Sequence, residues 1–209
     1  MNFVLTAWHE PEPITRERAR EIHAALGRGD TTAVRPHPGV AAFAGGLPEA
    51  EAASPEAEAA SPAYAVVTVG LDRSDEVART AFALARACGL VCYDPQRHLV
   101  HNLAPTGSFR EMQLHTGDGM VITDPDLGLV SDVLATLSAQ NPFAALVVFG
   151  RHFLQVSPEP GGYELEFKDS PRDLLLRTHV TGLKALQESF TDYATGDHTF
   201  LERHDWHQA

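Results

Sequence analysis

Residues 144–157, Ala-Ala-Leu-Val-Val-Phe-Gly-Arg-His-Phe-Leu-Gln-Val-Ser, carry the clearest structural signal in this sequence. Two mostly apolar runs flank Gly150-Arg151, and glycine at the first position of a two-residue turn is what a type II′ β-hairpin requires. Residues 163–168 then alternate apolar with charged side chains, which is typical of a strand with one face in water. A further strand, 174–180, follows a turn at 169–171. The pattern predicts an antiparallel meander.

Helices are expected on either side of this meander. Apolar side chains recur at helical spacing over 127–137, after the N-cap and proline signal Asp124-Pro125, and over 183–193, after a cap at Thr181. With a short strand at 120–123, the second half has the predicted order β-α-β-β-β-β-α.

The first half is predicted to run β-α-β-α-β-β. Strands are expected at 2–7, 64–70, 90–93 and 98–101, with 64–70 as a central strand buried on both faces. Helices are expected to begin at caps Thr15 and Ser74 and to end at Gly27 and Gly89. The fold class is therefore α+β, with two small sheet-plus-helix units: an N-terminal module, 1–104, and an acidic domain, 105–209.

The N-terminal module contains a repeat. Residues 48–61 are the heptad Pro-Glu-Ala-Glu-Ala-Ala-Ser written twice, followed by Pro62. The repeat has no large apolar side chain for a coiled-coil seam, and proline recurs in each unit. Together with the glycines and prolines before it, the repeat predicts a flexible insertion over 27–63.

Charge and composition exclude several classes of function. The net charge is −12, which argues against holding nucleic acid by its phosphates. No apolar run reaches the roughly 18 residues of a spanning helix, and the first ten residues lack a secretory pattern. Two cysteines fit a reducing compartment. We therefore expect a cytoplasmic protein that binds neither nucleic acid nor a membrane.

A metal site is weakly indicated. Cys88, Cys92, His98 and His101 have a spacing that superficially resembles a zinc site. If 98–101 is a strand, however, residues three apart point to opposite faces, so both imidazoles cannot reach one ion without a bulge. Cys88 also belongs to the apolar stripe of the preceding helix. We expect neither a metal nor another cofactor.

Catalysis is not indicated either. The motifs of phosphate-binding loops, serine hydrolases, zinc proteases and dinucleotide-binding folds do not occur in the sequence. The acid pairs Asp124 with Asp126 and Glu164 with Glu166 leave a hydrolase as one alternative, although a helix cap and a wet strand face explain them. A regulatory module that holds a small molecule near Tyr93, between the two units, is another alternative.

A resemblance to a known family enters in the second half. It rests on the spacing of apolar positions, and its features are Leu134 and Leu137 on a helix, Asn141-Pro142-Phe143, Phe-Leu-Gln-Val at 153–156, Gly-Tyr-Glu-Leu-Glu-Phe at 162–167, Phe190 before Tyr-Ala-Thr-Gly-Asp at 193–197, and Trp206. Residues 119–206 thereby resemble bacterial polymorphic-toxin immunity proteins, particularly those that protect against deaminase and other nucleic-acid-targeting toxins. The resemblance implies a small cytoplasmic protein without catalysis, which blocks a cognate toxin by occluding its active surface.

The charge of the second half agrees with this resemblance. A toxin that acts on nucleic acid needs a basic groove, and residues 105–209 carry seven basic and fifteen acidic groups that would be drawn to it. The acids expected to contact the toxin are Glu164, Glu166, Asp169 and Asp173. Two aromatic residues, Trp206 and Tyr93, are further candidates for partner binding.

Overall fold

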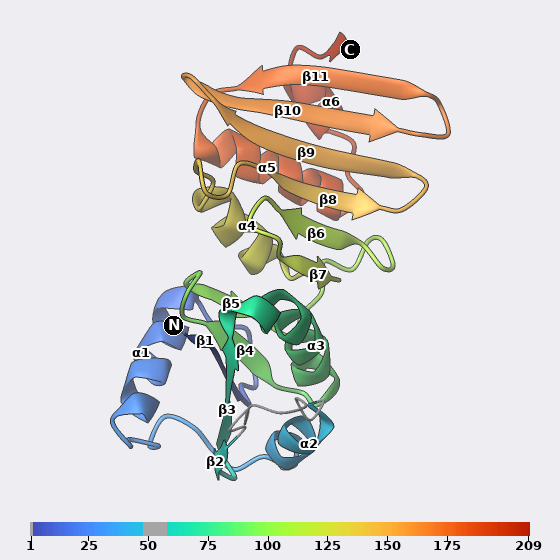
Figure 1. The fold of residues 1–209 in the computed structure, drawn as a ribbon. Coiled ribbons are helices and arrows are strands. Elements are labelled where there is room, and N and C mark those ends of the chain that lie inside the picture. Colours follow the sequence, from blue (N-terminus) through green and yellow to red (C-terminus); the bar gives the residue numbers. More distant parts are fainter. Residues whose placement is uncertain (1, 48–57) are drawn as a thin grey trace. The chain divides into compact units, whose positions relative to one another are not determined.

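The computed structural model describes residues 2–47 and 58–209 (Figure 1). The chain divides into two compact units, 1–103 and 104–209, each built on one sheet. All strand pairs in the described residues are antiparallel. The α+β class and the antiparallel C-terminal sheet predicted from the sequence are confirmed. In the described ranges, no helix combines the length and apolar character that a membrane crossing needs.

The N-terminal sheet has five strands in the order β2-β3-β1-β4-β5. Their bounds are β1 (Asn2–Trp8), β2 (Glu58–Ser61), β3 (Tyr64–Gly70), β4 (Val91–Asp94) and β5 (Leu99–His101). The middle strand is β1, whose last three residues, Thr6, Ala7 and Trp8, are all buried. The prediction that 64–70 is buried on both faces was wrong, because buried and half-buried residues alternate along β3.

Helices cover both faces of this sheet. Figure 1 shows α1 (Arg16–Gly27) on one side and α2 (Pro38–Gly46) with α3 (Ser74–Ala87) on the other. The helix α1 begins as predicted, since the Thr15 hydroxyl accepts a hydrogen bond from the Arg18 N–H at 3.2 Å. Its buried residues pack with Trp8 and Tyr93 in one apolar cluster. Ser74 does not cap α3 as predicted but is its first residue. Its hydroxyl donates a hydrogen bond to the carbonyl oxygen of Leu71, the first residue of the 3₁₀ turn Leu71–Arg73 that precedes α3.

The predicted insertion over 27–63 is partly structured. It contains α2 and β2, and Val40 and Phe43 of α2 are buried against the sheet unit. Gly39 allows a close approach at this point, because a Cβ there would lie 2.0 Å from Cys88 O. The glycines and prolines of this segment therefore build a short packed helix rather than only a loop. The repeat residues 48–57 lie outside the described residues.

The C-terminal sheet has seven strands in the order β12-β11-β10-β9-β8-β6-β7. Their bounds are β6 (Gln113–Thr116), β7 (Val121–Thr123), β8 (Ala144–Val148), β9 (His152–Glu159), β10 (Gly162–Asp169), β11 (Leu174–Val180) and β12 (His207–Gln208). The meander from β8 to β11 follows the predicted boundaries closely. The strands β6 and β12 were not predicted. The turn between β8 and β9 also differs from prediction: it is a three-residue loop, 149–151, with Gly150 at φ +70° in its middle.

Three helices lie together on one side of this sheet in Figure 1: α4 (Leu127–Ala135), α5 (Leu183–Ala194) and α6 (Phe200–Arg203). Two predicted caps were wrong. Asp126, rather than Asp124, accepts from the Leu129 N–H at 3.0 Å at the start of α4. The cap position of α5 is Gly182, at φ +92°, rather than Thr181. The core between sheet and helices includes fully buried leucine and phenylalanine side chains of both layers, among them Leu146, Leu154, Leu165, Leu186 and Phe190.

Candidate functional site

The C-terminal sheet has one face under helices and one face without them. Leu154 and Leu165, whose side chains are fully buried, mark the face that α4 and α5 cover. Because side chains alternate along a strand, Phe153, Glu164 and Glu166 lie on the opposite face. These three side chains are half-buried. Figure 1 shows the helices of this unit on the other side of the sheet only.

The predicted contact acids are held by basic neighbours. Glu166 faces Arg177 across β10 and β11, and the Arg177 Nε donates to the Glu166 carboxylate at 2.8 Å. This hydrogen bond and the nearby charge of Glu166 raise the pKa of Arg177. The charge of Glu164 raises it further. On the helix-free face Glu166 therefore pairs with Arg177, while Glu164 acts on the same guanidinium only through its charge.

Of the other two predicted acids, Asp169 points away from this face, and Asp173 pairs with Lys168, a residue of this face. Asp169 has the opposite parity from Glu164 and Glu166 on β10, so it points to the helix side, and it lies 3.5 Å from Arg172. Asp173 is on the β10–β11 turn and pairs with Lys168 at 2.9 Å, which lowers the pKa of Asp173. Residues 133–181 carry five acids and four bases, so this segment contributes little of the excess negative charge of the unit.

The two aromatic candidates are packed. Trp206 is half-buried, its indole N–H donates to Phe200 O at 3.3 Å, and its ring meets the Phe200 ring edge-on. Tyr93 is only 1% exposed, within the core of the N-terminal unit, and its hydroxyl is 2.8 Å from His98 Nδ1. The ring of Tyr93 therefore offers no surface to a partner in this structure, and its contact with a partner stays a prediction.

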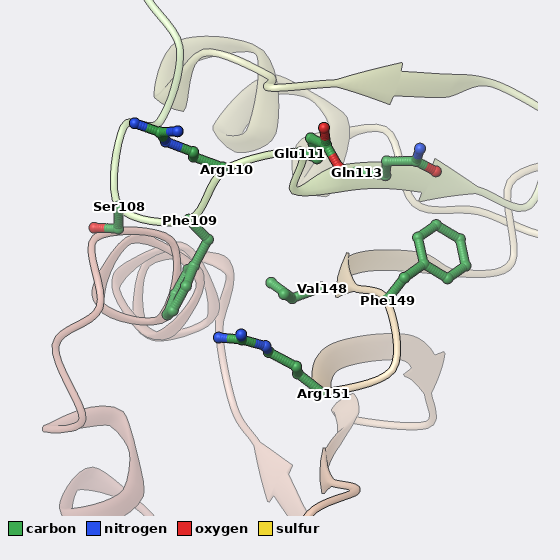
Figure 2. A pocket seen from close by; sticks show the side chains of 8 residues that line it. All are labelled: Ser108, Phe109, Arg110, Glu111, Gln113, Val148, Phe149 and Arg151. Atoms are coloured by element: carbon green, nitrogen blue, oxygen red, sulfur yellow. The ribbon is translucent and has the colours of Figure 1, made fainter.

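A cavity of about 490 Å³ opens on the C-terminal unit, where the loop before β6 meets the β8–β9 turn. The residues that line it are Ser108, Phe109, Arg110, Glu111, Gln113, Val148, Phe149 and Arg151. Figure 2 shows Phe109 and Phe149 on opposite sides with Val148 between them. Phe149 is 65% exposed, although aromatic side chains usually avoid water. This site was not predicted from the sequence.

The basic residues that line this cavity differ from the other basic residues of the unit in their ion pairs. Five of its seven basic side chains, at Lys168, Arg172, Arg177, Lys184 and Arg203, form ion pairs with carboxylates. Among the residues that the structure describes, Arg110 and Arg151 form none, and both line the cavity. Figure 2 shows Arg151 reaching across the opening towards Phe109, whereas Arg110 extends outward along the loop.

Contacts with His152 and Tyr193 hold Phe109 in the wall of the cavity. The Phe109 ring meets the His152 ring edge-on at 4.8 Å between centroids, and His152 Nδ1 lies 2.7 Å from the Tyr193 hydroxyl. Burial lowers the pKa of His152, against the opposing charge of Asp169. Burial also raises the pKa of Tyr193. Both groups are therefore neutral near pH 7 and hold the loop through a hydrogen bond rather than a charge.

A second polar cluster lies inside the N-terminal unit. Asp94 is fully buried and accepts hydrogen bonds from the N–H groups of Gln96 and Arg97, while the Arg97 guanidinium lies 3.0 Å from its carboxylate. Burial raises the pKa of Asp94, and the bonds from Arg97 oppose that rise. These bonds close the turn predicted at 94–97, so the cluster has a structural role.

The zinc reading of this region finds no geometric support. His98 bonds to Tyr93, on the α1 side of the sheet, while His101 stacks on Phe82 of α3, on the other side. Burial raises the pKa of the Cys92 thiol, which disfavours the thiolate that a metal needs. Among the described residues there is no group of three or more His, Cys, Asp or Glu side chains placed to share an ion.

The acid pairs considered for a hydrolase have other partners. Asp126 caps α4, and Glu166 is paired with Arg177.

Comparison with protein-family models, with curated proteins and with solved structures gives no match to this chain.

Proposed function

We propose that the chain is a non-catalytic immunity-type protein of the cytoplasm, whose C-terminal unit binds a basic protein toxin and occludes its active surface. The observation that carries the proposal is the helix-free face of the seven-stranded sheet, in a unit with seven basic and fifteen acidic side chains. A protein with this excess of negative charge attracts a basic partner over a distance of about one Debye length.

The composition of the helix-free face supports a protein partner. Val147 and Phe153 are neighbours across β8 and β9, both half-buried, and they provide apolar area on the inner strands near the β8–β9 turn. Glu164 and Arg177 provide charge towards the β11 edge. An apolar centre with a polar surround is the usual arrangement of a protein–protein interface.

The ion pairs on this face refine the electrostatic part of the proposal. Because Glu166 already holds Arg177, a basic side chain of the toxin gains less there than at an unpaired carboxylate. The negative field comes mainly from the two ends of the unit: residues 105–132 carry five acids and one base, and residues 182–209 carry five acids and two bases. We therefore propose that the helix-free face contacts the toxin and that the charge of the whole unit steers the toxin towards it.

Co-expression with toxin domains encoded beside this chain tests the proposal. Rescue of growth and co-purification of the two proteins are the expected results, and Phe153→Glu on the helix-free face should abolish both. Leu127→Glu is the matched control, because Leu127 is an exposed apolar residue at the start of α4 on the other face. Failure of every neighbouring toxin to be rescued, or equal loss with both variants, contradicts the proposal.

Charge reversal separates contact from steering. The four-residue variant Glu164→Lys, Glu166→Lys, Asp169→Lys and Asp173→Lys should slow association at least about tenfold and flatten its salt dependence. A control variant reverses four acids on α5 and beyond: Glu188, Asp197, Glu202 and Asp205. It should slow association by a similar factor but leave the dissociation rate unchanged, whereas the strand variant should also raise the dissociation rate. Unchanged association rates in both variants would contradict electrostatic steering of the toxin.

A further inference from the structure

The cavity beside the β8–β9 turn combines three features that belong to ligand sites. It has a volume of about 490 Å³, which is in the range of small-molecule pockets. It has aromatic side chains on two sides, Phe109 and Phe149, and a polar rim that includes Ser108 and Gln113. It also has basic side chains without acidic partners, in a unit where acids outnumber bases by two to one.

The unpaired arginines are the informative feature. With fifteen acids for seven bases, each basic side chain has many possible acidic partners. The five basic side chains away from the cavity each form an ion pair. Arg151 instead reaches over the opening, where its guanidinium faces Phe109 (Figure 2). A guanidinium in this position offers a planar set of donors to a carboxylate.

The backbone beside the cavity is strained. Glu111 adopts φ +59°, a left-handed conformation that side chains other than those of Asn, Asp and His rarely take. Backbone strain of this kind concentrates at binding sites. The strained residue directs the chain from the loop of Phe109 and Arg110 into β6, which carries Gln113 at the cavity.

The charge of the lining indicates the charge of the ligand. Two arginines and one glutamate line the cavity, which gives a local net charge of +1 inside a strongly acidic unit. This balance suits one negative charge better than two. The aromatic sides and Val148 suit a flat apolar body.

We propose that this cavity binds a small aromatic or apolar monocarboxylate, with Arg151 on the carboxylate and the ring between Phe109 and Phe149. Arg110, at the rim, adds attraction without direct contact. The cavity adjoins the helix-free face through which we propose that the toxin binds, because Gln113 lines the cavity and is the cross-strand neighbour of Val147 on that face.

Calorimetric titration of the full chain with 2-naphthoate tests the proposal. The expected result is saturable binding of one equivalent, weakened at least about tenfold for the neutral analogue 2-naphthamide and also weakened by added salt. Inorganic phosphate should not compete at equal concentration. Equal binding of the amide, competition by phosphate, or no binding of naphthoate at millimolar concentration overturns the proposal.

Variants locate the binding. Arg151→Gln should weaken naphthoate at least about tenfold, and Phe149→Ser should weaken it severalfold. Arg172→Gln is the matched control, because Arg172 is an exposed arginine on another turn of the same unit that lies near Asp169. Unchanged thermal unfolding checks that each variant folds. Equal affinity of Arg151→Gln and Arg172→Gln for naphthoate contradicts the assignment, because the carboxylate then binds elsewhere.

Discussion

The Tyr193 hydroxyl and the Nδ1 atom of His152 lie 2.7 Å apart and join α5 to the first residue of β9. Around this hydrogen bond the aromatic rings form a continuous series, because Phe109 contacts Tyr193, Tyr193 contacts Phe200, and Phe200 contacts Trp206. The series runs from the wall of the cavity to the last strand. The cavity loop and the C-terminal segment are thereby held on one rigid aromatic core.

Removal of the Tyr193 hydroxyl tests this arrangement. Tyr193→Phe keeps the ring contacts but leaves His152 without its partner, so the unfolding free energy of the C-terminal unit should fall by about 1–3 kcal/mol. Denaturant unfolding followed by Trp206 fluorescence in a Trp8→Phe background reports on this unit. Tyr163→Phe is the control, because Tyr163 is half-buried and its hydroxyl has no hydrogen bond within the described residues. A loss of the same size in the control would mean that the hydrogen bond is not responsible.

The buried ion pair of the N-terminal unit gives a larger expected effect. Asp94→Ala removes the acceptor of two backbone N–H groups and the carboxylate beside Arg97, so it should cost about 3–5 kcal/mol. Asp30 forms a similar side-chain turn with Thr32 at the surface, and Asp30→Ala should lower the unfolding free energy much less than Asp94→Ala, because Asp30 is exposed to water. Unfolding followed by Trp8 fluorescence in a Trp206→Phe background measures both. Similar costs at the two positions would show that burial of Asp94 does not set the size of the effect.

Two glycines of α2 should respond oppositely to the same substitution. A Cβ at Gly39 would lie 2.0 Å from Cys88 O, so Gly39→Ala forces α2 away from the end of α3 and should cost about 1–3 kcal/mol. A Cβ at Gly45 meets nothing within 4 Å, so Gly45→Ala should stabilise the helix by about 0.5–1 kcal/mol. Thermal unfolding gives both signs. A loss of stability from Gly45→Ala would contradict the packing of α2.

The elements that the sequence predicts best are those whose burial leaves a periodic trace. In β10 each buried residue alternates with a charged or half-buried one, and in α1 the spacing of Ala19, Ile22 and Leu26 matches one helix face. In contrast, the prolines and glycines around Val40 and Phe43 concealed α2, because a nine-residue helix offers only two turns of pattern. The short strand β6 was missed for a related reason, since its pairing with β8 is a long-range contact.

The candidate site was less predictable than the fold. A surface arginine and a pocket arginine look alike in sequence, and the difference between Arg151 and Arg172 emerges only when their neighbours are known. The same holds for the acids, because the pairing of Glu166 with Arg177 depends on the register of two strands. The sequence could have drawn attention to Phe149, an aromatic residue next to the glycine of a turn.

His101 should make the N-terminal unit sensitive to acid. Both ring nitrogens of His101 are buried without a hydrogen-bond partner, and the ring stacks on Phe82 with centroids 3.7 Å apart. Burial, together with the charges of Arg97 and Arg86, lowers the pKa of His101 to about 3. In the unfolded chain the pKa of a histidine is near 6.5, so between pH 6.5 and 3 the unfolded state binds the extra proton. The stability that depends on neutral His101 is complete above pH 6.5 and falls as the pH decreases, by up to about 1.4 kcal/mol per pH unit.

Replacement of His101 by phenylalanine isolates this contribution. His101→Phe keeps the stacking on Phe82 and removes the two unpartnered nitrogens, so the unfolding free energy at pH 7 should rise by about 1–3 kcal/mol. The dependence on pH should become shallower between pH 6.5 and 4 without vanishing, because burial also lowers the pKa of His23 in this unit. Denaturant unfolding at several pH values, followed by Trp8 fluorescence in a Trp206→Phe background, measures both effects. His207→Phe, at an exposed position on β12, should change neither, and an unaltered pH dependence in His101→Phe would assign the acid sensitivity to other groups.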